Sequence, residues 1–131
     1  IILILLSSCF LVTSMSAQTL DINNDEINEL MNNNVPIVDI RTSDEWNQTG
    51  VVPNSVLLTF FKKDGSYNFE AWYRKLGYLI YINKPFILIC RSGRRTKLVS
   101  KMLNNYSDMT IYNAEKGINS WLQSNLNIVK P

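Results

Sequence analysis

The chain has 131 residues, a formal net charge of +2, two cysteines and no histidine. Its length allows one globular domain, and a content of 46% hydrophobic and 18% charged residues argues against a disordered chain. The absence of histidine excludes the Ser-His-Asp and Cys-His mechanisms in their usual form, together with histidine-ligated zinc and haem. Two cysteines are too few for a thiolate zinc site or an iron–sulfur cluster, so we expect neither a metal nor a cofactor.

The first 17 residues have the apolar core and the cleavage region of a secretory signal peptide. Residues 1–12 are almost wholly apolar, no charged residue occurs before Asp21, and small, mildly polar residues follow as far as Ala17. The apolar run is shorter than the ~20 residues that span a membrane comfortably. We therefore expect an exported, periplasmic bacterial protein whose mature domain covers residues 18–131.

Three alternatives for this first segment stay open. The stretch Leu6-Ser7-Ser8-Cys9 has the form of a lipoprotein box, in which Cys9 would carry the lipid and anchor the protein to a membrane. The other two alternatives are an uncleaved membrane anchor and a buried helix of the fold itself. We expect contact with a membrane only if the segment is retained or lipidated. If it is removed, the mature protein keeps a single cysteine, Cys90, which cannot form an internal disulfide.

Helices and strands are expected to alternate along the rest of the chain. Capping boxes begin two of the helices, with Asn23 and Thr42 as the N-cap residues and a glutamate three residues after each. Five unbroken apolar residues over 85–89 are typical of a strand that is covered on both faces. The expected strands are 36–40, 55–58, 85–89 and 109–112, and the expected helices are 23–34, 42–50, 66–76 with Gly77 as the C-cap, 96–103 and 118–122. This order predicts an α/β fold with an open, mainly parallel central sheet and helices on both faces.

Charge is distributed unevenly along the chain. Residues 18–61 carry a net charge of −6 and residues 62–131 a net charge of +8. The basic excess is greatest over residues 91–101, which hold five bases and no acid. Aromatic side chains are not interleaved with these bases, as they are in many proteins that bind single-stranded nucleic acid. We therefore expect a small anion, and no nucleic acid, as the partner of this segment.

The segment best suited to chemistry is Cys90-Arg91-Ser92-Gly93-Arg94-Arg95-Thr96. A strand would deliver Cys90 to the carboxyl edge of the sheet, where open α/β sheets bind their ligands. The loop then runs into the amino end of a helix, so its backbone N–H groups can curve around an anion, and Gly93 permits the tight turn. These N–H groups and the arginine side chains would stabilise a thiolate. Cys90 is therefore the predicted nucleophile, rather than a small buried residue that closes a strand.

The length of the loop favours one kind of anion over another. A cysteine-dependent phosphatase needs the pattern C-x5-R, so that the loop spans a whole tetrahedral phosphate. Here the last arginine, Arg95, gives C-x4-R, and the next position is Thr96. A loop one residue shorter suits a single additional sulfur atom on the cysteine better than a phosphoryl group. A phosphatase or an arsenate reductase is therefore the less favoured alternative.

Four blocks of sequence resemble the single-domain rhodaneses, which are thiosulfate sulfurtransferases. In chain order the blocks are 37–41 with Glu45, Trp46 and Gly50; 52–55; 90–96; and 115–118 with Trp121. The resemblance covers nearly the whole of the expected mature domain. It departs from the family pattern at Val51, where many relatives have histidine, and at Asn54 and Lys116, where glycine is common. Of these three, Lys116 is the one expected to add charge near the cleft.

The resemblance implies a ping-pong mechanism, in which Cys90 takes the outer sulfur of a donor such as thiosulfate as a persulfide. Cyanide, a thiol or a protein cysteine then removes that sulfur. The loop residues that would bind the substrate or the persulfide are Arg91, Ser92, Gly93, Arg94, Arg95 and Thr96. We expect Arg91 and Arg94 to steer the anionic donor, and Arg95 to hold the loop against an acidic residue. Thr96 is expected to cap the following helix, with its hydroxyl within reach of the sulfur.

Other residues of the four blocks are expected to support the structure. Asp39 and Arg41 are two positions apart in a strand, so both point to the same face and can neutralise each other there. Glu45 is assigned to the same supporting group. Residues 60–63, two phenylalanines and two lysines, are candidates for the rim of the cleft. One further alternative is a non-catalytic binding module in which Cys90 has no chemical role.

Overall fold

The computed structural model describes residue 11 and residues 16–131, so Cys9 and most of the expected signal segment lie outside the described residues. The elements follow in the order β1 (Gln18–Ile22), α1 (Asn24–Asn32), β2 (Ile37–Asp39), α2 (Ser43–Thr49), β3 (Val56–Leu57), α3 (Phe69–Leu79), β4 (Phe86–Ile89), α4 (Arg94–Tyr106), β5 (Thr110–Ala114) and α5 (Gly117–Gln123). The strands form one sheet in the order β1-β5-β4-β2-β3, and every pair in it is parallel. The predicted α/β fold is confirmed. Across the described part of the chain, no helix combines the length and the apolar character that crossing a membrane requires.

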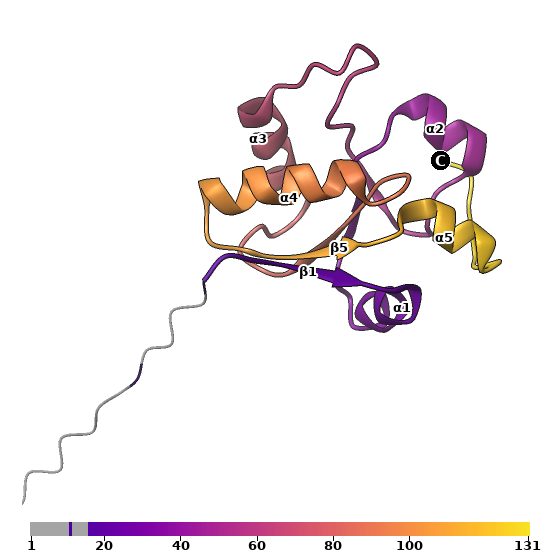
Figure 1. Cartoon of the computed structure of the whole chain (residues 1–131), viewed down its shortest axis with the longest axis horizontal. Coiled ribbons are helices and arrows are strands. Elements are labelled where there is room, and N and C mark those ends of the chain that lie inside the picture. The colour runs from indigo at the N-terminus through magenta and orange to yellow at the C-terminus, as the bar shows by residue number, and fades with distance from the viewer. Residues whose placement is uncertain (1–10, 12–15) are drawn as a thin grey trace, which may run out of the picture.

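Helices cover both faces of this sheet (Figure 1). On one face, a cluster of buried side chains joins the sheet to α3 and α4, and it includes Leu76 of α3, Leu103 of α4 and Leu88 of β4. On the other face, Ile27 of α1 and Ile118 of α5 belong to a second cluster. Parallel sheets are stable when both faces are buried in this way.

The strand β1 was missed by the sequence analysis. It lies at the edge of the sheet and pairs with β5 from Gln18 opposite Thr110 to Ile22 opposite Ala114. Only Ile22 of its five residues is buried, because β1 is an edge strand with a solvent-exposed side. Such a short strand, directly after the expected cleavage region, has little hydrophobic periodicity to reveal it.

Two helix boundaries also differ from the sequence prediction. α3 begins after Asn68, whose side chain accepts a hydrogen bond from the N–H of Ala71, and it continues to Leu79. Gly77 was predicted as its C-cap, which is wrong, because Gly77 lies within the helix and lacks the positive φ of a glycine cap. α4 begins earlier than predicted, since its N-cap is Gly93.

The connectivity of the sheet determines where a ligand can bind. From β2 the chain moves outward to β3, whereas from β4 it moves in the opposite direction to β5. β2 and β4 are neighbours, so the helices that follow them lead away from a shared crevice at their carboxyl ends. This is the topological switch point at which open α/β sheets bind ligands. Cys90 directly follows β4 there.

Candidate active site

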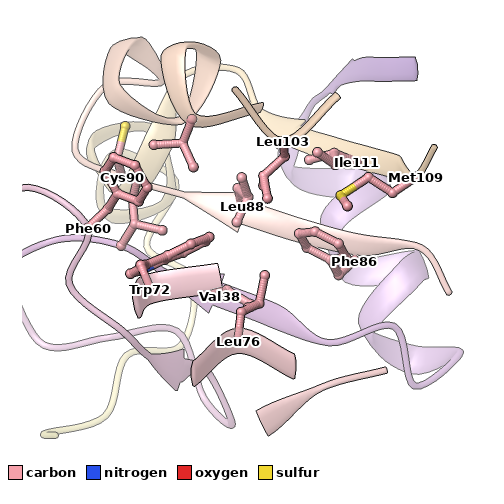
Figure 2. Close-up of a cluster of buried hydrophobic side chains, with 12 residues drawn as sticks. Val38, Phe60, Trp72, Leu76, Phe86, Leu88, Cys90, Leu103, Met109 and Ile111 are labelled. Carbon is pink, nitrogen blue, oxygen red and sulfur yellow. The ribbon is translucent and has the colours of Figure 1, made fainter. Parts of the chain in front are cut away.

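Cys90 is buried, with 1% of its surface exposed, at the carboxyl end of β4. Figure 2 shows it beside Phe60 at one end of the core cluster, whereas Phe86 and Met109 lie at the other end. The backbone N–H of Gly93 donates a hydrogen bond to its Sγ atom at 3.2 Å. The hydroxyl oxygen of Thr96 lies 3.5 Å from the same sulfur. A donated N–H favours an anionic sulfur over a neutral thiol.

Gly93 gives the loop its tight curve. Its φ is +90°, in the left-handed region, and a Cβ atom there would lie 1.9 Å from the carbonyl oxygen of Glu115. No other residue type fits this position without displacing the backbone at the end of β5. The close approach therefore holds the Gly93 N–H where it meets the Cys90 sulfur.

The amino end of α5 holds the loop from the other side. The N–H of Ile118 donates to the carbonyl of Cys90 at 2.8 Å, and the N–H of Asn119 donates to the carbonyl of Arg91 at 3.1 Å. Gly117 permits this contact, because a Cβ atom on it would lie 2.5 Å from the Arg91 carbonyl. Backbone contacts alone therefore hold the loop on both sides.

Arg95 binds both carboxylate oxygens of Glu45, at 2.9 and 2.6 Å. The hydrogen bonds to Arg95 lower the pKa of Glu45 to about 2, with a further contribution from the N–H of Thr42. The hydrogen bond to Glu45 in turn raises the pKa of Arg95 above its usual range. Glu45 also completes the capping box of α2 with Thr42, so one carboxylate joins α2 to the first turn of α4, directly after the loop that follows Cys90.

Asp39 and Arg41 form a buried ion pair at the end of β2, with exposed fractions of 0% and 1%. The Nη2 atom of Arg41 lies 2.7 Å from Oδ2 of Asp39, and its Nε atom donates to both carboxylate oxygens. The remaining donors of Arg41 reach Thr49 and the carbonyl of Gly50. The pair connects β2 to the end of α2 and so supports the element that carries Glu45.

Thr96 does not cap α4, contrary to the sequence prediction. The N-cap is Gly93, and Thr96 lies within the first turn of the helix, where it is fully buried. Its hydroxyl donates toward the Gly93 carbonyl at 3.1 Å and toward Oδ1 of Asn113, in β5, at 2.5 Å. Asn113 was missed by the sequence analysis. A polar residue between the buried Ile111 and Ala114 is the only local sign that it lies inside the fold.

A cleft of about 580 Å³ lies over this loop. Arg91, Ser92, Arg94 and Arg95 line one side of it. Part of the predicted rim is also present: Phe61, Lys62 and Lys63 line the cleft, whereas Phe60 is buried in the core. Lys116 was expected near this cleft, but it lines a separate cavity of about 320 Å³ between α1 and α5. The cleft is cationic: among the described residues that line it, Glu45 is the only acid and is paired with Arg95, and Lys63 is paired with Asp44. Lys62, Arg91 and Arg94 form no ion pair with another described residue.

The described part of the chain contains no group of three or more histidine, cysteine, aspartate or glutamate side chains that could hold a metal ion.

A family model of the Rhodanese-like domain matches residues 23–124. The chain belongs to this family. Among curated proteins, this rhodanese-like chain is 29% identical over 109 residues to an uncharacterized protein of Rickettsia prowazekii. That alignment covers 74% of this chain and 85% of the relative.

Solved structures share the same rhodanese-like fold. A protein of M. tuberculosis superposes with a TM-score of 0.73 and 22% identity, over 88% of this chain and all of that one (100%). A homodimeric polysulfide-sulfur transferase of Wolinella succinogenes superposes with a TM-score of 0.64 and 23% identity, over 85% of this chain and 78% of that one. At these identities the likeness establishes the common fold. The family membership rests on the match over residues 23–124.

Proposed function

We propose that this rhodanese-family protein is a sulfurtransferase that carries a sulfane sulfur on Cys90 as a persulfide. The observation that carries the proposal is the N–H of Gly93, 3.2 Å from the Cys90 sulfur, in a loop that leads into a cationic cleft. A neutral, structural thiol does not need an aligned N–H donor, whereas an anionic sulfur does. The C-x4-R spacing of the loop leaves less room for a phosphoryl group than a phosphatase requires.

The reaction proceeds in two balanced steps. The Cys90 thiolate attacks the outer sulfur of a donor such as thiosulfate and forms an S–S bond, while the S–S bond of the donor breaks and its electron pair leaves with sulfite. An acceptor then attacks the terminal sulfur, and the electron pair of the persulfide bond returns to Cys90. Cyanide gives thiocyanate, and a thiol gives a new persulfide. The sulfur is transferred at the same oxidation level, so no external oxidant is needed.

The charge around the cleft supports a small anionic donor. Arg91 and Arg94 are exposed on its wall, and neither forms an ion pair with another described residue. Their positive potential raises the local concentration of an anion and speeds its encounter with the loop. The physiological acceptor is proposed to be a thiol, on a small molecule or on a protein, with cyanide as its substitute in the assay.

The test is incubation with thiosulfate, followed by intact-mass measurement and then by addition of cyanide. We expect a mass increase of one sulfur atom, release of sulfite in the first step, and thiocyanate in the second. Cys90→Ser is expected to lose all three signals while its unfolding transition stays close to that of the unsubstituted protein. Absence of both the added mass and thiocyanate would contradict the proposal and favour a binding module. Hydrolysis of an aryl phosphate would favour a phosphatase.

We also propose that residues 1–17 direct export of the protein. The support is their charge-free, apolar sequence followed by small residues. The mature protein, isolated from the cells that produce it, is expected to begin at Ala17 or Gln18. An intact mass that includes a lipid on Cys9, or the whole segment, would contradict signal cleavage and favour an anchored protein.

A further inference from the structure

Four polar side chains lie in a row that begins at the exposed face of β1 and ends at the Cys90 sulfur. The amide Nδ2 of Asn113 donates to Oδ1 of Asp21 at 2.8 Å. The Thr96 hydroxyl lies 2.5 Å from Oδ1 of the same amide, and 3.5 Å from the Cys90 sulfur. Cys90, Thr96 and Asn113 are each at most 2% exposed, so water does not compete for these contacts.

The direction of each hydrogen bond in this row follows from donor and acceptor chemistry. A carboxylate only accepts, so Asp21 fixes the amide with its NH₂ group outward and its oxygen toward Thr96. The Thr96 hydroxyl has one proton and three acceptors nearby: Oδ1 of Asn113, the carbonyl of Gly93 and the Cys90 sulfur. The shortest of these contacts is with Oδ1 of Asn113. While the sulfur is a thiol, this amide oxygen therefore accepts the hydrogen bond from the Thr96 hydroxyl. The thiol can then donate its own S–H to the oxygen of Thr96.

An anionic sulfur changes this arrangement. A thiolate or a persulfide anion cannot donate, and a lone pair of Thr96 directed at it is unfavourable. The Thr96 proton must therefore turn from Asn113 to the sulfur, which leaves the amide oxygen of Asn113 without its buried donor. Asn113 and the sulfur anion thus compete for one proton.

We propose that Asn113, anchored by Asp21, is a positioning residue that controls whether Thr96 donates its proton to the active-site sulfur. This role rests on the proposed function, because it tunes the same Cys90 anion that accepts and releases sulfur. Thr96 stabilises the anion, and the loss of the hydrogen bond between Thr96 and Asn113 subtracts from that stabilisation. The hydrogen bond between Thr96 and Asn113 keeps the resting thiol less reactive. Once the sulfur is an anion, the Thr96 hydroxyl becomes its second donor, beside the Gly93 N–H.

Other charged groups surround Cys90 and must stay constant in the test. Arg91 and Arg94 belong to the loop and α4, the ion pair of Arg95 with Glu45 joins α4 to α2, and the ion pair of Asp39 with Arg41 lies at the end of β2. Asp21 reaches the sulfur only through Asn113 and Thr96. Substitutions at positions 21, 96 and 113 therefore leave the charges nearest the sulfur unchanged.

The experiment is the rate of Cys90 alkylation by iodoacetamide as a function of pH, in the full domain. Thr96→Val removes the donor and is expected to slow alkylation at neutral pH by about 3–10-fold, with the midpoint of the pH profile moved upward. Asn113→Ala releases the Thr96 proton to the sulfur, so it is expected to speed alkylation by a similar factor, with the midpoint moved downward. Thr96→Ser keeps the hydroxyl and is expected to restore the profile of the unsubstituted protein.

The double variant provides the decisive comparison. Asn113→Ala is expected to have no effect on the pH profile in a Thr96→Val background, because no hydroxyl proton is left to compete for. Shifts of the two single variants in the same direction, or an equal effect of Asn113→Ala in both backgrounds, would overturn the proposal. Asp21→Ala, at an exposed position that tolerates substitution, is expected to move the profile in the direction of Asn113→Ala. An unchanged pH profile in Asp21→Ala would contradict the proposed anchoring of Asn113 by Asp21.

The readout also separates this inference from the proposed function. Alkylation needs no sulfur donor, so the opposite shifts can be seen in a protein that transfers no sulfur. Absence of thiocyanate with the opposite shifts present would contradict sulfur transfer and leave the role of Asn113 intact. Thiocyanate formation without those shifts would support sulfur transfer and contradict the proposed role of Asn113.

Discussion

Arg95 in the first turn of α4 binds both carboxylate oxygens of Glu45 in the first turn of α2, although the two residues are 50 positions apart in sequence. The side chains are 27% and 22% exposed, so solvent screens the pair only in part. Glu45 also accepts the N–H of Thr42 in the capping box of α2. The same carboxylate therefore stabilises the start of one helix and holds the start of another, directly after the loop that follows Cys90.

Glu45→Gln separates these two roles, because glutamine keeps the capping box and removes the charge pair. We expect a loss of about 1–2 kcal/mol in the free energy of unfolding at pH 7, measured by urea denaturation. The pKa of Glu45 is lowered from 4.5 to about 2 in the folded protein. Its stabilisation is therefore complete above pH 4.5 and is lost as the pH falls toward 2.

The difference in stability between the unsubstituted protein and Glu45→Gln should accordingly shrink over that acidic range. Glu29→Gln is the matched control, since Glu29 is exposed on α1 and forms no ion pair in the described part of the chain. A constant difference from neutral pH to pH 2 would show that the charge of Glu45 does not contribute.

Gly93→Ala tests the close approach that shapes the loop. The new Cβ would lie 1.9 Å from the Glu115 carbonyl oxygen, at a φ of +90°. We expect a loss of more than about 2 kcal/mol in unfolding free energy, and a fall in sulfur transfer of about 100-fold as the N–H moves away from the sulfur. Gly65→Ala is the control for backbone strain alone, because Gly65 has a φ of +83° and open space around it. It should lose only about 1 kcal/mol. Equal losses would refute the steric argument.

Local signals in the sequence account for much of this fold. The capping boxes at Asn23 and Thr42 were predicted and are present, because an N-cap and its glutamate lie within one turn. The buried strand that ends before Cys90 was equally clear, since its apolar run needs no distant partner to be recognised. The contacts of the site depend on tertiary structure instead. Asn113 reaches Asp21 only because β5 pairs with β1, and Gly117 approaches Arg91 only because α5 lies beside the loop.

Asp39→Asn is expected to be among the most destabilising conservative changes in the domain. It leaves the guanidinium of Arg41, 1% exposed, without a counter-charge, which costs about 3–5 kcal/mol. Adding Arg41→Met removes the unpaired charge, so the double variant should be destabilised less than the sum of the two single variants, by about 1–3 kcal/mol. Urea denaturation of all four proteins gives the coupling energy. Additive losses would indicate that the pair contributes only through packing.

Arg94→Gln tests whether the cations of the cleft recruit the donor. Arg94 lines the cleft, is exposed and forms no hydrogen bond with the Cys90 sulfur. Its expected contribution is therefore the long-range electrostatic attraction of the anionic donor. We expect the KM for thiosulfate to rise about fivefold with kcat nearly unchanged. The kcat/KM of the unsubstituted protein should also fall as the ionic strength rises from about 20 mM to about 300 mM, and less steeply for the variant. Lys84→Gln is the control: it also removes one positive charge, but Lys84 precedes the amino end of β4, whereas Cys90 follows the carboxyl end. This variant should leave KM unchanged. A fall in kcat with an unchanged KM would instead place Arg94 in the chemical step, because an interaction made only in the transition state acts on kcat.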